Sequence, residues 1–202
     1  MQEVFLWRSP RSPINTNSER RHTVKHILVV VDMQTDFVDG ALGTPEAVAI
    51  LPAVADKIKA YAADPDGAIL VTYDTHTEAY AETSEGKHLP VPHCIKGTEG
   101  WALHPTVAAV LEGVTYTPVE KPTFGSVKLP ELVAEVAQGG DFSVELIGLC
   151  TDICVVSNTL LLKAHFPETE ISVDASCCAG VTPATHEAAL TTMEMCQIRV
   201  TR

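Results

Sequence analysis

Residues 148–155 read Gly-Leu-Cys-Thr-Asp-Ile-Cys-Val and join an apolar run to an amphipathic one. The apolar residues that lead into this stretch predict a buried strand, and the pattern after it predicts a helix. Cys154 therefore stands at the start of the predicted helix, where unpaired N–H groups and the positive end of the helix dipole favour a thiolate. The same N–H groups can bind an oxyanion. The stretch predicts a strand–turn–helix unit that presents a nucleophilic cysteine.

The alternation of short apolar runs with longer amphipathic runs extends over the chain from His26 onward. It is typical of strands and helices wound around a parallel sheet. The predicted strands are residues 27–31, 68–73, 114–119, 143–149, 171–173 and 197–200, and the predicted helices are residues 52–63, 105–111, 129–138, 152–165 and 183–195. The pattern predicts one doubly wound α/β domain with Rossmann-like topology, in which a six-stranded, mainly parallel sheet carries helices on both faces.

Polar side chains come directly after four of these strands, at Asp32, Asp74, Lys121 and Cys154. Ligands of such sheets bind beyond the carboxyl ends of the strands, so we expect the four residues to share one site. A carboxylate as base, an ammonium as electrostatic anchor and a thiol as nucleophile form a workable catalytic set. The sequence lacks the glycine-rich phosphate loops and the Gly-x-Ser-x-Gly motif, which removes support for nucleotide binding and for a serine hydrolase.

Each of these residues also has an ordinary structural interpretation. Asp32 fits an N-cap or a salt bridge, Lys121 fits an exposed lysine, and free cysteine is often a small buried hydrophobe. No C-x-x-C pair occurs among the other five cysteines, so neither a structural zinc site nor a thioredoxin-type site is predicted; these are Cys94, Cys150, Cys177, Cys178 and Cys196. The combination of residues, rather than any one of them, predicts catalysis.

A second group of polar residues follows the second predicted strand. Asp74 and His76 lie two apart on an extended segment and therefore face the same side. Glu85, His88 and His93 follow in a short, proline-containing loop. Mixed oxygen and nitrogen donors suit Zn, Mn or Fe better than a structural thiolate site does. The spacing predicts one divalent metal ion, with Glu85 and His88 as alternatives for one ligand position.

Composition limits the class of protein and of partner. A chain of 202 residues with 46% hydrophobic residues is typical of one globular domain, and its net charge of −12 disfavours nucleic acid as a partner. No apolar run approaches the roughly 20 residues that a membrane span needs. Residues 1–25 are basic and proline-containing and predict a disordered leader, whereas residues 26–202 form the predicted domain. Unpaired cysteines without a signal peptide indicate a cytoplasmic protein.

Several short motifs carry a resemblance to a known family. They read Val-Asp-Met-Gln-Thr-Asp-Phe at 31–37, Asp-Thr-His at 74–76, His-Cys-Ile-Lys-Gly-Thr at 93–98 and Thr-Asp-Ile-Cys-Val at 151–155, and Lys121 accompanies them. Together they resemble the isochorismatase-like cysteine hydrolases, and within them the nicotinamidases, over residues 26–202. The resemblance gives catalytic places to Asp32, Lys121 and Cys154 and metal-ligand places to Asp74, His76 and His93. Glu85 resembles the fourth ligand of some bacterial members.

The resemblance also implies a reaction, in which nicotinamide becomes nicotinate and ammonia through a cysteine thioester, as in NAD salvage. Asp32 would accept the proton of the Cys154 thiol, and Lys121 would stabilise the charges that result. The backbone N–H groups of Cys150 and Cys154 would bind the oxyanion, with a cis peptide at Leu149–Cys150 turning the former inward.

The family pattern also bears on cofactor and assembly. The metal ion, with Zn favoured over Mn and Fe, would bind the pyridine nitrogen and orient the ring. Phe37 and Phe124 are candidates to pack on the ring faces, although both residues also fit a core. Since family members usually self-associate, the resemblance implies a homo-oligomer.

Other functions remain open at this stage. Related amidases that act on N-carbamoyl or ureido compounds would share Asp32, Lys121 and Cys154. Isochorismatase-type hydrolases resemble this chain in fold but lack the metal-ligand set, which disfavours them. A metal-dependent hydrolase with a bystander cysteine, or a non-enzymatic binding module, is a further alternative, and the filled catalytic positions disfavour the binding module.

Overall fold

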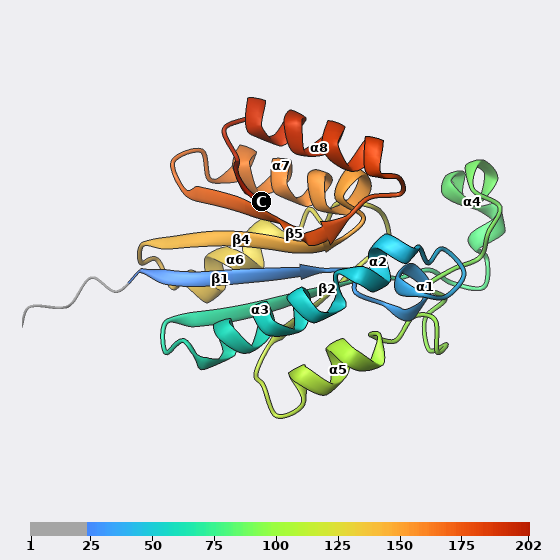
Figure 1. The fold of residues 1–202 in the computed structure, drawn as a ribbon, viewed down its shortest axis with the longest axis horizontal. Helices are drawn as coiled ribbons and strands as arrows, with labels where there is room; N and C mark the ends of the chain where they lie inside the picture. Colours follow the sequence, from blue (N-terminus) through green and yellow to red (C-terminus); the bar gives the residue numbers. More distant parts are fainter. Residues whose placement is uncertain (1–23) are drawn as a thin grey trace, which may run out of the picture.

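The computed structural model describes residues 24–202, and a six-stranded sheet runs through its centre (Figure 1). All strand pairs of this sheet are parallel, and the strand order is β3-β2-β1-β4-β5-β6. The strands are β1 (Lys25–Val31), β2 (Gly67–Asp74), β3 (Thr117–Lys121), β4 (Phe142–Leu149), β5 (Glu170–Ala179) and β6 (Arg199–Thr201). This topology confirms the predicted doubly wound α/β fold. The order reverses between β1 and β4, where such folds open a crevice for ligands.

Helices cover both faces of the sheet. The longer ones are α3 (Leu51–Ala63), α5 (Pro105–Leu111), α6 (Leu129–Ala137), α7 (Val156–His165) and α8 (Pro183–Met195). Figure 1 shows α3 and α5 on one side of the strands and α7 and α8 on the other. Shorter helical segments are α1 (Thr35–Val38), α2 (Pro45–Ala49), a 3₁₀ turn (Tyr80–Glu82) and α4 (Ser84–His88). The sequence did not predict these, because three to five residues are too few for a helical period to show.

The central strand β1 is buried on both faces, which explains its unbroken apolar sequence. Leu28 and Val30 pack in one core with residues of α3 and α5. Ile27, Val29 and Val31 point the other way, into a second core with residues of α6, α7 and α8. The two cores hold β1 rigidly, so Asp32, which follows β1 at the carboxyl end of the sheet, has a fixed position.

Two strands differ from their predicted bounds in ways that affect the site. Residues 114–116, predicted as strand, connect α5 to β3, and the strand ends instead at Lys121, which pairs with Asp74 of β2. β5 is much longer than predicted because its second half continues along β4 up to the pair Leu149 and Ala179. The polar residues Asp174 and Ser176 hid this continuation, since they interrupt the apolar run.

The predicted leader, residues 1–25, lies outside the described residues except for Val24 and Lys25, and Lys25 begins β1. Among residues 24–202, no helix has the length and apolar character needed to cross a membrane.

Candidate active site

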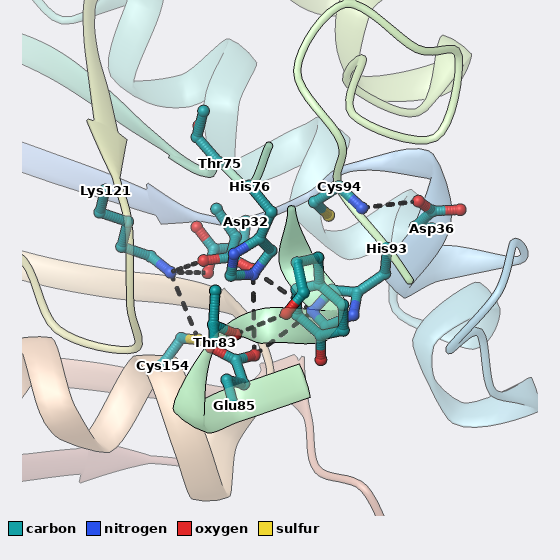
Figure 2. Close-up of polar contacts among 12 residues, drawn as sticks. Asp32, Asp36, Thr75, His76, Thr83, Glu85, His93, Cys94, Lys121 and Cys154 are labelled. Atoms are coloured by element: carbon teal, nitrogen blue, oxygen red, sulfur yellow. Dashed lines mark hydrogen bonds and ion pairs between the residues drawn. The ribbon is translucent and has the colours of Figure 1, made fainter. Parts of the chain in front are cut away.

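Asp32, Lys121 and Cys154 meet at or just beyond the carboxyl ends of β1, β3 and β4 (Figure 2). The ammonium nitrogen Nζ of Lys121 lies 2.6 Å from Oδ2 of Asp32 and 3.5 Å from Sγ of Cys154. All three side chains are buried, with Lys121 only 1% exposed. The structure therefore brings together the three residues that the sequence predicted to converge, although they are far apart in the chain.

Asp32 leaves β1 with a left-handed backbone, at a φ of 48°. Its N–H donates to Thr72 Oγ1 at 3.1 Å, and the Thr72 hydroxyl donates to Asp32 Oδ1 at 2.6 Å. Oδ2 is thereby left to face Lys121. Burial raises the pKa of Asp32, and the attraction of Lys121 does not cancel that effect. A carboxylate with a raised pKa is better suited to accept a proton.

Lys121 lies between two carboxylates. Its Nζ is 3.2 Å from Asp74 Oδ1 as well as 2.6 Å from Asp32 Oδ2. Burial alone would lower the pKa of Lys121, but the charges of Asp32, Cys154 and Asp74 raise it above its usual value. The lysine therefore stays protonated and supplies a permanent positive charge beside the thiol.

Cys154 lies in an irregular turn of π-helical form, Thr151–Val155, which precedes α7. The expectation that a helix start would lower its pKa is wrong. Burial raises the pKa of the Cys154 thiol, the charge of Asp32 raises it further, and Lys121 offsets these only in part. In the resting protein the sulfur carries its proton, so a base must remove that proton when the thiol reacts.

The turn that carries Cys154 is held from several sides. The carbonyl of Cys150 accepts hydrogen bonds from the N–H groups of Ile153 and Val155, both at 3.1 Å. The side-chain amide of Asn158 donates to the carbonyl of Cys154 at 2.8 Å. Sequence reasoning did not find Asn158. The peptide bond between Leu149 and Cys150 is cis, as the resemblance implied.

Gly148 lets β4 approach β1 closely. Its φ is +114°, and a Cβ at this position would lie 2.2 Å from the carbonyl oxygen of Val31. A side chain would therefore separate the two strands next to Asp32. We expect Gly148→Ala to lower activity and stability together, which paired turnover and urea-denaturation measurements would detect; Gly140→Ala, where the nearest atom is 3.5 Å away, is the matched control.

Four side chains converge beside this group, with one donor atom from each within 4.8 Å of the others; they are Asp74, His76, Glu85 and His93. His76 Nε2 lies 2.8 Å from Asp74 Oδ2 and 3.7 Å from Glu85 Oε1. His93 Nε2 lies 3.5 Å from each of the same two oxygens. Asp74, His76 and His93 are buried, and Glu85 is half-buried. Two imidazole nitrogens and two carboxylate oxygens form a donor set that fits one Zn²⁺, Mn²⁺ or Fe²⁺ ion.

The orientation of the imidazoles supports this fit. His93 Nδ1 lies 2.8 Å from the carbonyl oxygen of Val91, so Nδ1 carries the proton and the lone pair of Nε2 points to the cluster. His76 Nε2 is buried and, although Asp74 Oδ2 lies 2.8 Å away, it makes no well-aligned hydrogen bond to any of the described residues; a metal ion would satisfy it. His88, the alternative to Glu85, lies apart. It is exposed, and its Nδ1 lies 2.7 Å from the carbonyl oxygen of Ser84.

Charge interactions within the cluster shift two of its carboxyl groups in opposite directions. Burial opposes ionisation of Asp74, but the imidazoles of His76 and His93 and the charge of Lys121 outweigh it and hold the pKa well below its usual value. The pKa of Glu85 is raised, by burial first and by the charge of Asp74 second. The charge of Asp74 thus opposes the ionisation of Glu85 within the cluster.

Asp74 belongs to both groups of residues. Its Oδ1 faces Lys121 and its Oδ2 faces His76 and His93. The buried side chain of Gln34 fixes its backbone, because Oε1 accepts the Asp74 N–H at 2.7 Å and Nε2 donates to the Asp74 carbonyl at 2.9 Å. Sequence reasoning assigned no role to Gln34, although it lies inside the 31–37 motif.

A cavity of about 300 Å³ opens onto both groups. Asp74, Glu85, His93, Cys150 and Cys154 form its polar side. The rest of its wall is mainly apolar and includes the two predicted ring-packing residues; it consists of Phe37, Leu42, Thr44, Ala47, Leu89, Phe124, Leu149, Ile153, Gly180 and Val181.

Phe37 and Phe124 differ in their surroundings. Phe37 is buried and its ring lies 5.4 Å from that of His93, whereas Phe124 is 42% exposed at the rim of the cavity. Both line the same cavity.

Comparison with known proteins places the chain among hydrolases. The isochorismatase domain model matches residues 26–202. The curated nicotinamidase/pyrazinamidase of Mycobacterium tuberculosis is 27% identical over 183 residues, which are 86% of this chain and 96% of that protein. The solved pyrazinamidase/nicotinamidase of Streptococcus mutans is 25% identical with a TM-score of 0.75, covering 88% of this chain and 100% of that one. The pyrazinamidase of Pyrococcus horikoshii, solved in complex with zinc, is 23% identical with a TM-score of 0.70, covering 88% and 99%.

Proposed function

Because this chain belongs to the isochorismatase family, we propose that it is an amidohydrolase that converts nicotinamide to nicotinate and ammonia. The observation that carries the proposal is one cavity whose wall holds both Cys154 and members of the metal-binding cluster, namely Asp74, Glu85 and His93. Such a cavity can hold an aromatic amide by both ends. The curated and solved relatives of this chain that are named as nicotinamidases support the same proposal.

The arrangement of Asp32, Lys121 and Cys154 supports a covalent route. Asp32 takes the proton from Cys154 as Sγ attacks the carboxamide carbon, and Lys121 balances the negative charge that develops. The N–H groups of Cys150 and Cys154 bind the oxyanion of the tetrahedral intermediate. Asp32 then protonates the departing ammonia, which leaves a thioester. Water cleaves the thioester, and the thiol regains its proton.

The metal-binding cluster supports a positioning role in this scheme. Asp74, His76, Glu85 and His93 would hold the ion, which when bound supplies a Lewis-acidic contact for a pyridine nitrogen. The attacking group is the sulfur of Cys154. Phe37 and Phe124, from the cavity wall, would pack against the two faces of the ring.

The charge of the cavity wall favours a neutral substrate. Within the described range, residues 24–202, those that line the cavity include two acidic side chains, Asp74 and Glu85, and neither lysine nor arginine. A carboxylate buried against the apolar part of the wall, away from the metal-binding cluster, would find no cationic side chain among these lining residues, which costs several kcal/mol. N-carbamoyl amino acids and isochorismate carry such carboxylates, whereas nicotinamide and pyrazinamide do not.

A substrate panel tests the function. Purified protein should release ammonia from nicotinamide and pyrazinamide with a kcat/KM at least about a hundredfold above that for an N-carbamoyl amino acid, because the acid would bury an unpaired carboxylate. Ammonia is measured by a coupled assay, and benzamide, which lacks the ring nitrogen, is the matched control for the contact to the metal. Faster turnover of the carbamoyl acid than of nicotinamide would make the chain a different amidase of the same family.

Metal content tests the cluster. Elemental analysis of the purified chain should find one divalent ion per chain, and His76→Ala should lose it because His76 supplies a buried nitrogen donor. Glu85→Ala should weaken binding by roughly 10- to 100-fold. His88→Ala should keep the ion, since His88 faces Ser84 instead. Retention in Glu85→Ala together with loss in His88→Ala would show that His88 is the ligand.

A further inference from the structure

One aromatic side chain packs against both imidazoles of the metal-binding cluster. Tyr80 is 1% exposed, and its ring centroid lies 4.8 Å from that of His76 and 5.0 Å from that of His93. The two imidazoles are 5.0 Å apart, and all three pairs meet edge to face. Rings packed in this way restrict one another's rotation. Tyr80 therefore helps to set the direction in which each Nε2 points.

The hydroxyl of Tyr80 connects α4, which carries Glu85, to the segment that leads to His93. It donates to the carbonyl oxygen of Leu89 at 2.8 Å. The Leu89 N–H donates to the carbonyl of Glu85 at 2.8 Å and so closes the end of α4, the helix that carries this ligand. The same Leu89 carbonyl accepts the N–H of Val91, whose own carbonyl orients His93. One hydroxyl thus ties the Glu85 helix to the backbone that orients His93.

The start of α4 is fixed to Tyr80 as well. The Thr83 hydroxyl donates to the carbonyl of Tyr80 at 2.7 Å and accepts the N–H of Gly86 at 3.0 Å. A Cβ at Gly86 would lie 2.1 Å from the carbonyl oxygen of Tyr80, so only glycine permits this approach. These contacts matter because α4 stands at the edge of the molecule, away from the sheet (Figure 1).

We propose that Tyr80 is the positioning residue of the metal site, an inference that rests on the metal site proposed above. Its ring orients His76 and His93, and its hydroxyl holds Glu85 in reach of them. Tyr80 acts through these three ligands, not on the ion itself. A tyrosine that only filled the core would affect the free energy of unfolding but not the affinity for metal.

Two substitutions distinguish the contribution of the Tyr80 ring to metal binding from that of its hydroxyl. Tyr80→Phe keeps the ring and removes the bond to Leu89, so the dissociation constant for Zn²⁺ should rise roughly three- to tenfold. Tyr80→Leu also removes the aromatic contacts, and the rise should reach roughly ten- to a hundredfold. The measurement titrates the zinc-loaded full chain with a chromophoric chelator. Excess Zn²⁺ should restore the nicotinamide turnover of Tyr80→Phe, since the catalytic residues are untouched.

Tyr61→Phe is the matched control. The Tyr61 hydroxyl donates to Glu145 Oε2 of β4 at 3.0 Å, and neither residue belongs to the cluster, so its loss should leave the zinc affinity unchanged. Thermal denaturation of each loaded variant reports folding. Wild-type affinity in both folded Tyr80 variants would overturn the inference and leave the metal site standing. A wild-type chain that binds no divalent ion would overturn both.

Discussion

The Cys154→Ala variant is expected to lose amide hydrolysis by a factor of roughly 10⁴ or more in kcat. In the wild type, Cys154 supplies Sγ, the nucleophile of the covalent route, and no neighbouring side chain can replace it. Sγ is buried and lies 3.5 Å from Lys121 Nζ. Losing one sulfur from a buried site leaves the fold intact. Ammonia release measures the loss, and mass spectrometry of quenched wild-type protein should detect the acyl-enzyme that the variant cannot form.

Cys150→Ala is the matched control for this loss. Cys150 lines the same cavity, but only its backbone N–H has a role in the proposed reaction, so much of the activity should remain. Iodoacetamide, a small neutral alkylating agent, should inactivate the wild type through Cys154. If Cys154→Ala hydrolysed nicotinamide at a comparable rate, or the alkylated protein stayed active, the covalent route would be wrong and a metal-activated water would replace it.

Lys121→Met should lower the free energy of unfolding by roughly 3–5 kcal/mol at neutral pH. The substitution leaves Asp32 and Asp74 buried next to each other without the ammonium that lies 2.6 and 3.2 Å from them. Urea denaturation measures the change. Lys59→Met is the control, since Lys59 pairs with Asp56 on the exposed face of α3 and its loss should stay within about 0.5 kcal/mol.

The deficit of Lys121→Met should shrink as the pH falls. Burial already raises the pKa of Asp32 in the wild type, and removing its cation raises that pKa further. The folded variant then takes up a proton at a pH where the unfolded chain does not, so lowering the pH through the raised pKa stabilises the folded form. The free energy of unfolding of the variant and of the wild type is therefore measured from neutral pH down to the pKa of an ordinary aspartate. A constant difference between them over this range would show that Lys121 does not neutralise buried charge.

The sequence was sufficient to predict which residues converge. Asp32, Asp74 and Cys154 each come at or just after an apolar run, and parallel strands bring their carboxyl ends to the same edge of a sheet. Lys121 was found in spite of a misplaced strand, because its position beyond the apolar residues at 118 and 119 was enough. Membership of the isochorismatase family, predicted from motifs spread over residues 31–155, is confirmed by the match over 26–202.

The sequence could not predict the residues that act across long separations in the chain. Thr72 bonds Asp32 and Gln34 bonds Asp74, in each case over 40 residues, and neither threonine nor glutamine signals such a partner by its type. The pKa of Cys154 was predicted in the wrong direction for the same reason. A local rule about helix ends favoured a thiolate, whereas the burial and the Asp32 charge that decide the outcome depend on the folded chain.

The choice between Glu85 and His88 also needed the fold. The two residues lie three apart on α4, so a helical period places both on similar sides of it. Only the turn of the loop, fixed by Tyr80 and Gly86, directs Glu85 toward the cluster and leaves His88 to face Ser84. Chemistry alone would have allowed either donor.

The shared position of Asp74 constrains how this protein can diverge. Under the proposed function, a substitution there removes one of the four metal-binding side chains and one of the two carboxylates beside Lys121, so a single change at Asp74 would disable both groups of residues. The other three members of the cluster pair with one another and with Asp74, and not with Lys121; they are His76, His93 and Glu85. A lineage, or an engineer, seeking a metal-independent hydrolase on this scaffold would therefore exchange the histidines and the glutamate first and keep the aspartate, which also pairs with Lys121.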